Sequence, residues 1–143
     1  MNSKTISSGS KNGFSPEDTC SSGKHTVLYI EDNSTNRELV RYILELRSNF
    51  IYLEAETGGE GLKLAQNHHP DLILLDINLP DMDGYTVFNR LQDDTKTADI
   101  PVIALTGKGP LDEMGKETAG FTKFLSKPID IKEFHNSLDA IFK

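Results

Sequence analysis

Residues 71–84, DLILLDINLPDMDG, contain the stretch that decides the fold. Its first part places the aliphatic run 72–75 between Asp71 and Asp76, with no alternation of apolar and polar residues. A strand with one solvent-exposed face alternates in this way, whereas a central strand of a parallel sheet is buried on both faces and is continuously apolar. Residues 71–76 therefore predict a central parallel strand, and the loop that follows contains Pro80 and Gly84 and leads into a helix.

Further strands and amphipathic helices alternate on both sides of this run. Strands are predicted at residues 26–30, 50–53, 100–106 and 121–126, and helices begin at Asn33 or Ser34, at a capping box of Thr57 and Glu60, after Gly84, near Pro110, and at Asp130 with Glu133. The helix between Thr106 and Gly120 is the least regular, because Gly115 lies inside it. Five strands alternating with five helices predict a doubly wound α/β fold with a parallel five-stranded sheet.

The composition excludes several classes of protein. The 143 residues include 22 Asp or Glu against 15 Lys or Arg, so the formal net charge of −7 argues against nucleic-acid binding. The aliphatic run 72–75 is the longest uninterrupted one and is far below the roughly 20 residues of a membrane-spanning helix. Because Cys20 is the single cysteine and no secretory signal is recognisable, we expect a cytoplasmic protein without an intrachain disulfide.

The chain divides near residue 24. Residues 1–24 contain seven Ser and three Gly but few apolar residues, a composition that cannot bury enough surface to fold. We therefore expect a disordered tail at 1–24 and one folded domain at 25–143.

Polar side chains follow four of the predicted strands. Glu31 and Asp32 follow the first strand, Asp76 ends the third, Thr106 ends the fourth and Lys127 follows the fifth. Parallel strands present their carboxyl ends at one edge of the sheet, so these groups are expected to converge. Three neighbouring carboxylates repel one another unless a hard cation such as Mg²⁺ lies among them. An aspartate there can attack phosphorus and form an acyl phosphate, with the lysine and the threonine holding the phosphoryl oxygens.

These residues resemble the receiver domains of two-component response regulators. The resemblance is carried by Glu31-Asp32, by Asp76 within LLDINLPDMDG, by Thr106 within PVIALTG and by Lys127 within FLSKP. The separations are also similar to the family's, with 44 residues from Asp32 to Asp76, 30 from there to Thr106 and 21 more to Lys127. The similarity extends over residues 26–142 and implies the flavodoxin-like strand order 2-1-3-4-5.

The resemblance implies a role for each residue at the edge of the sheet. Asp76 would be the phosphoacceptor and would ligate Mg²⁺ together with Asp32. Glu31 would act mainly through a metal-bound water, and Asn78 would offer its backbone carbonyl to the metal.

Other residues are assigned to the phosphoryl group and to switching. Thr106 and Lys127 would hold the phosphoryl group, with a cis peptide bond between Lys127 and Pro128. Thr106 and Phe124 would form the switch, Phe124 being the aromatic residue that turns inward on activation. These roles describe a regulatory phosphoacceptor rather than an enzyme.

The resemblance also implies partners. A histidine kinase or a histidine phosphotransfer protein would donate the phosphoryl group. A downstream protein would bind the helix predicted after Thr106, the strand 121–126 and the last helix, and the domain would be a monomer or a phosphorylation-dependent dimer. Since Lys143 alone follows the last predicted helix, we expect output through protein contact, or a receiver excised from a larger hybrid kinase.

Two alternatives remain open from the sequence. A haloacid-dehalogenase-like phosphatase also combines an aspartate nucleophile with a hydroxyl and a lysine, but its nucleophile belongs on the first strand with a second aspartate two residues later, where this chain has Asn78. A flavodoxin-like binding module needs a phosphate-binding loop after the first strand, where Glu31 and Asp32 would repel the phosphate.

Overall fold

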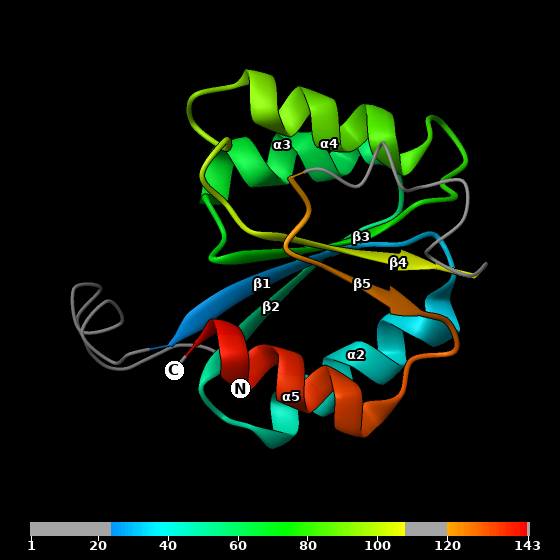
Figure 1. The fold of residues 1–143 in the computed structure, drawn as a ribbon, viewed down its shortest axis with the longest axis vertical. Coiled ribbons are helices and arrows are strands. Elements are labelled where there is room, and N and C mark those ends of the chain that lie inside the picture. The colour runs from blue at the N-terminus through cyan, green and yellow to red at the C-terminus, as the bar shows by residue number, and fades with distance from the viewer. Residues whose placement is uncertain (1–23, 108–119, 143) are drawn as a thin grey trace.

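The computed structural model describes residues 24–107 and 120–142. This part of the chain forms five strands and four helices (Figure 1). In chain order they are β1 (His25–Ile30), α2 (Ser34–Leu46), β2 (Phe50–Ala55), α3 (Gly58–His68), β3 (Leu72–Asp76), α4 (Gly84–Asp93), β4 (Val102–Thr106), β5 (Lys123–Ser126) and α5 (Ile131–Ile141). The helix predicted between Thr106 and Gly120 falls on residues outside the described part.

The five strands form one sheet in the order β2-β1-β3-β4-β5, and every neighbouring pair is parallel. This confirms the predicted doubly wound α/β fold and its strand order. As predicted, β3 is central: Leu75 lies opposite Ile30 of β1 on one side and Ala104 of β4 on the other. The carboxyl ends of β1, β3 and β4 therefore meet at one edge of the sheet.

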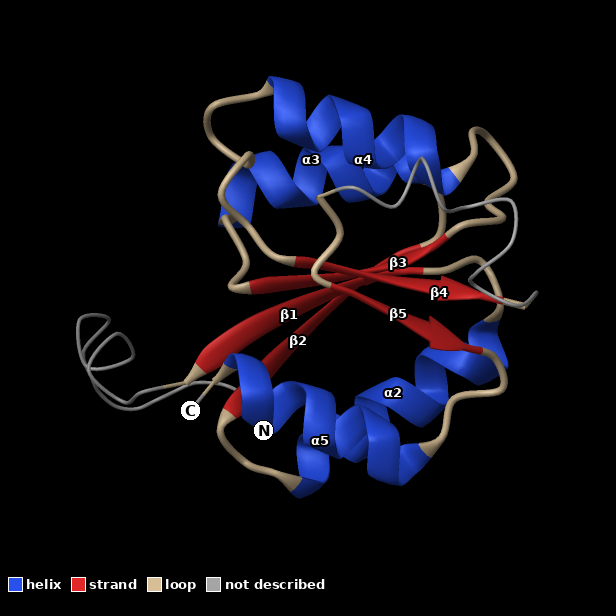
Figure 2. Cartoon of the chain, in the orientation of Figure 1, coloured by secondary structure: helices blue, strands red, loops and turns tan. Residues whose placement is uncertain are grey.

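Helices cover both faces of the sheet, with α3 and α4 on one face and α2 and α5 on the other (Figure 2). Successive side chains of β3 enter the two layers in turn. Leu72 and Leu74 pack with residues of α2 and α5, whereas Ile73 and Leu75 pack with residues of α3 and α4. All four are completely buried, and each contributes roughly 2 kcal/mol of apolar burial. The run lacks alternation because each of its residues faces a hydrophobic core.

Three helices begin at the predicted caps. Asn33, Thr57 and Asp130 each accept a hydrogen bond from the backbone N–H three residues further on. The capping box at α3 is only half formed, because the Glu60 carboxylate accepts from the N–H of Glu56 rather than that of Thr57. Two to four residues separate the starts of these helices from the carboxyl ends of β1, β2 and β5.

Each strand differs from the prediction at one boundary, β1 and β3 by a single residue, since they begin at His25 and Leu72. β5 begins at Lys123 rather than at Phe121, because the Phe121 ring leaves the sheet and stacks on Phe88 of α4 at 4.0 Å between centroids. β4 begins after Pro101, which has no N–H to donate, and β2 continues to Ala55. Among the described helices, none has the length and apolar character needed to span a membrane.

Candidate functional site

Three carboxylates meet at the carboxyl edge of the sheet. Glu31 and Asp32 follow β1, Asp76 is the last residue of β3, and the two strands are paired neighbours. One oxygen from each carboxylate lies within 4.8 Å of the others. Glu31 and Asp76 are 1% and 2% exposed, whereas Asp32 is open to solvent. The convergence predicted for these residues is therefore present in the fold.

Lys127 enters this cluster from the loop after β5. Its Nζ lies 2.8 Å from Oε1 of Glu31 and 3.1 Å from Oδ1 of Asp76, so it bridges the two buried carboxylates. Its backbone N–H donates to the carbonyl of Thr106 at 2.8 Å, which ties the loop to the end of β4. The peptide bond between Lys127 and Pro128 is cis, as predicted.

Burial and charge set the acidity of the bridged groups in opposite directions. Burial raises the pKa of Asp76 to about 6, and the nearby negative charge of Glu31 adds to this, although the N–H of Asn78 and the Lys127 ammonium oppose it. Burial also disfavours the charged form of Glu31, but Lys127 and Tyr29 outweigh it and lower the pKa of Glu31. Burial would lower the pKa of Lys127, yet the two carboxylates hold it above its usual value.

The donor set fits a hard divalent cation. Three carboxylate oxygens within reach of one another, one of them solvent-exposed, are ligands that Mg²⁺ prefers while it retains several waters. The backbone N–H of Asn78 donates to Oδ1 of Asp76 at 3.1 Å, which places Asn78 beside the cluster. The metal-ligand roles of Glu31, Asp32, Asp76 and the Asn78 carbonyl remain predictions.

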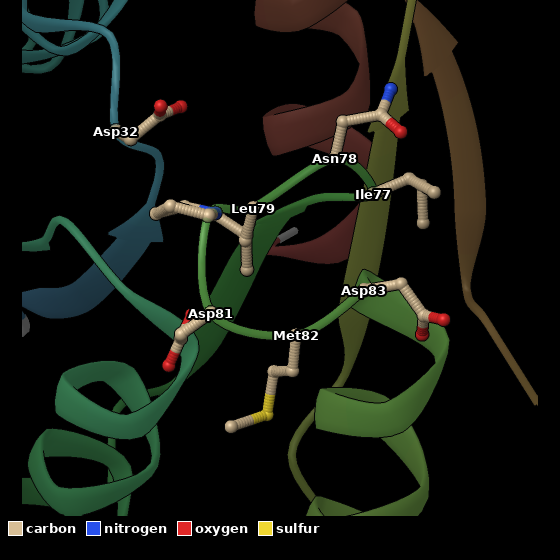
Figure 3. A pocket seen from close by; sticks show the side chains of 8 residues that line it. Asp32, Ile77, Asn78, Leu79, Asp81, Met82 and Asp83 are labelled. Atoms are coloured by element: carbon tan, nitrogen blue, oxygen red, sulfur yellow. The ribbon is translucent and has the colours of Figure 1, made fainter.

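A pocket of about 420 Å³ opens beside the cluster. Asp32 stands on one side and the loop Ile77–Asp83 on the other (Figure 3). The Asp81 carboxylate in this loop accepts hydrogen bonds from the N–H groups of Gly58 and Gly59, at 2.8 and 2.9 Å. These backbone bonds lower the pKa of Asp81 and attach the loop to the start of α3. The pocket beside Asp32 is thus bordered by a loop that is anchored to the start of α3.

Thr106 and Phe124 lie on neighbouring strands close to this edge. Thr106 is 3% exposed, ends β4 and pairs in register with Ser126, the residue before Lys127. Phe124 is half-buried, and its ring lies 5.0 Å from that of Phe121. The positions agree with the predicted phosphoryl-holding and switch roles, which stay predictions.

The sequence interpretation missed two polar side chains beneath the site. Tyr29 is completely buried, and its hydroxyl donates to Oε1 of Glu31 at 2.9 Å. Arg37 of α2 is 9% exposed, and one of its guanidinium nitrogens donates to the Glu31 carbonyl at 2.9 Å. For Tyr29 a signal was available, because it precedes Glu31 by two residues and strand side chains two apart share a face.

Known proteins share this arrangement in sequence and in fold. The sequence profile of the response regulator receiver domain matches residues 27–139. The polar-differentiation response regulator DivK of Brucella ovis is 41% identical over 118 residues, which are 80% of this chain and 94% of that protein. DivK of Brucella anthropi is 40% identical over the same coverage. The phosphatase alternative is not supported by these comparisons.

Solved structures agree. The receiver domain of a sensor histidine kinase from Pseudomonas aeruginosa, with a magnesium ion in its active site cleft, has a TM-score of 0.75 and 25% identity and covers 83% of this chain and 98% of its own. A CheY-like receiver domain from Methylobacillus flagellatus has a TM-score of 0.74 and 26% identity, with 82% and 98% covered. The chain therefore belongs to the response regulator receiver domain family of two-component signalling.

Proposed function

We propose that this receiver domain works by accepting a phosphoryl group on Asp76. The observation that carries the proposal is the position of Lys127, whose Nζ contacts both Glu31 and Asp76 in a largely buried cluster. An ammonium group held against a buried aspartate at a sheet edge is placed to neutralise negative charge that is added to that aspartate. A pocket of about 420 Å³ lies beside the cluster, with Asp32 in its lining, and offers space next to the proposed site.

The chemistry is a displacement at phosphorus. A carboxylate oxygen of Asp76 attacks the phosphorus of a phosphohistidine, the new O–P bond forms as the P–N bond breaks, and the leaving imidazole takes up a proton from solvent. The attacking carboxylate must be ionised, and with a pKa of about 6 most Asp76 is ionised at neutral pH. The product is an acyl phosphate on Asp76.

The chain's own residues hold the transferred group. Lys127 pairs with a phosphoryl oxygen, and the Thr106 hydroxyl at the end of β4 donates to another. Glu31, Asp32, Asp76 and the Asn78 carbonyl would hold Mg²⁺, which when bound neutralises charge on the phosphoryl oxygens. Nothing in this arrangement needs turnover of a separate substrate, so the domain acts as a regulatory phosphoacceptor rather than as a conventional enzyme.

The donor and the target follow from this chemistry. We propose a histidine kinase or a histidine phosphotransfer protein as the donor. Drawing Thr106 and Lys127 toward the phosphoryl group shifts the ends of β4 and β5, and with them Phe124. A downstream protein, or a second copy of the domain, would read this change on β5, α5 and the helix predicted after Thr106.

Labelling with a small phosphodonor tests the proposal. Acetyl phosphate with Mg²⁺ should add one hydroxylamine-sensitive phosphoryl group to the wild-type chain, detected by intact mass. Asp76→Asn should take up none, whereas the exposed control Asp93→Asn should be labelled like the wild type. Equal labelling of Asp76→Asn and the wild type would sink the assignment of Asp76.

A further inference from the structure

A buried phenol lies beneath the acidic cluster. The Tyr29 side chain has no solvent exposure, and its hydroxyl donates to Oε1 of Glu31 at 2.9 Å. The β ladder continues through Glu31, whose backbone N–H donates to the carbonyl of Ala55 at 2.9 Å. Tyr29 and Glu31 therefore share one face of an extended segment, and the phenol contacts the carboxylate from the buried interior.

The Glu31 carboxylate depends on a small set of donors. Oε1 accepts from both Tyr29 and Lys127, the latter at 2.8 Å, and Oε2 accepts from the backbone N–H of Asn33 at 3.2 Å. The side chain is 1% exposed, so water has little access to replace a lost donor. An unpaired carboxylate in such a position is costly, and each donor therefore matters.

The two side-chain donors to Glu31 in the described part of the chain differ in one respect. The Lys127 ammonium is shared between two carboxylates, because its Nζ also lies 3.1 Å from Oδ1 of Asp76. The hydrogen bond of the Tyr29 hydroxyl is made to Glu31. A phosphoryl group on Asp76 competes for the ammonium. If Lys127 turned toward such a group, the hydrogen bonds from the Tyr29 hydroxyl and the Asn33 N–H would still be available to Glu31.

We propose that Tyr29 is a positioning residue of the phosphorylation centre. It holds the Glu31 carboxylate in place for the metal and stabilises it when Lys127 moves to the phosphoryl group. Tyr29 touches none of the reacting atoms and acts through Glu31. The inference rests on the proposed function, since the exchange of Lys127 follows from phosphorylation of Asp76.

The neighbouring strand offers a matched control. Tyr52 of β2 donates its hydroxyl to Oε1 of Glu54 at 2.9 Å, two residues further along the same strand. This pair has the same two-residue spacing and hydrogen-bond length as Tyr29 and Glu31, but it is only half-buried, and the Tyr52 hydroxyl also lies 3.2 Å from the carbonyl of Arg37. Glu54 is not part of the carboxylate cluster. Tyr29→Phe and Tyr52→Phe each remove one phenolic hydroxyl and keep the ring.

The test compares the wild type with these two variants. Calorimetric titration with Mg²⁺ gives the metal affinity, and labelling by acetyl phosphate at saturating Mg²⁺ gives the phosphorylation rate. Tyr29→Phe should weaken Mg²⁺ binding and slow labelling by about tenfold each. Tyr52→Phe should stay within about twofold of the wild type in both. If Tyr29→Phe matches Tyr52→Phe in both measurements, the positioning role is wrong.

A double-mutant cycle with Glu31→Gln tests the route of action. Because Tyr29 acts through Glu31, adding Tyr29→Phe to Glu31→Gln should change Mg²⁺ affinity by no more than about twofold. A further loss of about tenfold would overturn the inference. Failure of the proposed function looks different: the wild type would then take up no phosphate on Asp76, while the Mg²⁺ titrations would still decide the role of Tyr29.

Discussion

The carboxyl and amino ends of the strands, called here the carboxyl edge and the amino edge of the sheet, carry ion pairs of different character. At the carboxyl edge, Lys127 lies between Glu31 and Asp76, whose side chains are 1% and 3% exposed. At the amino edge, where α2 and α5 end, Arg47 contacts Asp139 at 2.6 Å, and the Asp139 side chain is 62% exposed. The shorter contact is the more solvated one. Burial, rather than distance, decides what each contact contributes.

The amino edge is stabilised by ring packing instead. His25 at the start of β1 stacks on Phe142 at 4.2 Å, and Phe50 at the start of β2 meets Phe142 edge-on at 5.5 Å. Ring contacts of this kind stabilise the fold without burying charged groups that would each need an oppositely charged partner. The carboxyl edge carries buried charges that oppose folding unless they are paired, so stability depends there on the same few groups to which we assign the phosphorylation chemistry.

The largest effect is expected from removing the shared cation. Lys127→Met keeps an apolar side chain of similar length but leaves Glu31 and Asp76 without their ammonium partner. We expect the free energy of unfolding at neutral pH to fall by about 3 kcal/mol. The phosphorylation rate should fall about 100-fold, because the developing negative charge loses its counter-ion. Urea unfolding in EDTA and acetyl phosphate labelling measure the two effects.

Lys123 provides the control for this substitution. It lies on β5, four residues before Lys127, and its side chain is exposed. Lys123→Met should change stability by no more than about 0.5 kcal/mol and leave labelling intact. Similar losses of stability and labelling in Lys127→Met and Lys123→Met would mean that the buried contacts of Lys127 contribute no more than those of an exposed lysine.

A stabilising effect is expected from Asp76→Asn. The folded-state pKa of about 6 lies above the ordinary value of 3.8, so the folded protein binds a proton at Asp76 more tightly than the unfolded chain does. The ionised carboxylate therefore disfavours folding, and this penalty develops as the pH rises from about 4 through about 6. In metal-free buffer Asp76→Asn should raise the free energy of unfolding at pH 7.5 by up to about 3 kcal/mol.

The sign of the pH dependence makes this prediction distinctive. Near pH 4 the wild-type carboxyl is protonated in the folded state, so the advantage of the asparagine variant should largely disappear. Urea unfolding of the wild type and of Asp76→Asn at pH 4 and pH 7.5 measures the difference in their free energies of unfolding at each pH. Destabilisation by Asp76→Asn at pH 7.5 would show that the Lys127 contact outweighs the burial of the carboxylate.

The sequence was sufficient to predict the sheet and the convergence of the site. Continuous apolar runs identify β3 and β4 because each residue faces a core, and parallel pairing then places Asp76 beside Glu31. Lys127 was predicted to hold the phosphoryl group. Its contact with both carboxylates depends on the path of the loop after β5, which no local pattern encodes.

Sequence reasoning failed where a side chain has two plausible roles. Phe121 suits a strand, yet its ring stacks on Phe88 of α4, a contact between residues distant in the chain. Tyr29 reads as an ordinary core aromatic; its two-residue spacing places it on the same face as Glu31, but the hydrogen bond between the two side chains is seen only in the fold. Glu60 has the right spacing for a capping box but bonds to Glu56 instead. Tertiary geometry decides between such alternatives.

The smallest effect is expected at the amino edge. In Asp139→Asn, Arg47 keeps its contact with Nδ1 of His135 at 3.1 Å and its position over the Phe50 ring at 5.5 Å. Because Asp139 is well solvated, the lost pair should cost about 0.5 kcal/mol of unfolding free energy, and less in high salt. Urea unfolding at low and high ionic strength measures this, and Mg²⁺ titration should show no change. A loss as large as that of Lys127→Met, or an altered Mg²⁺ affinity, would mean that the two edges are energetically coupled through α2 and α5.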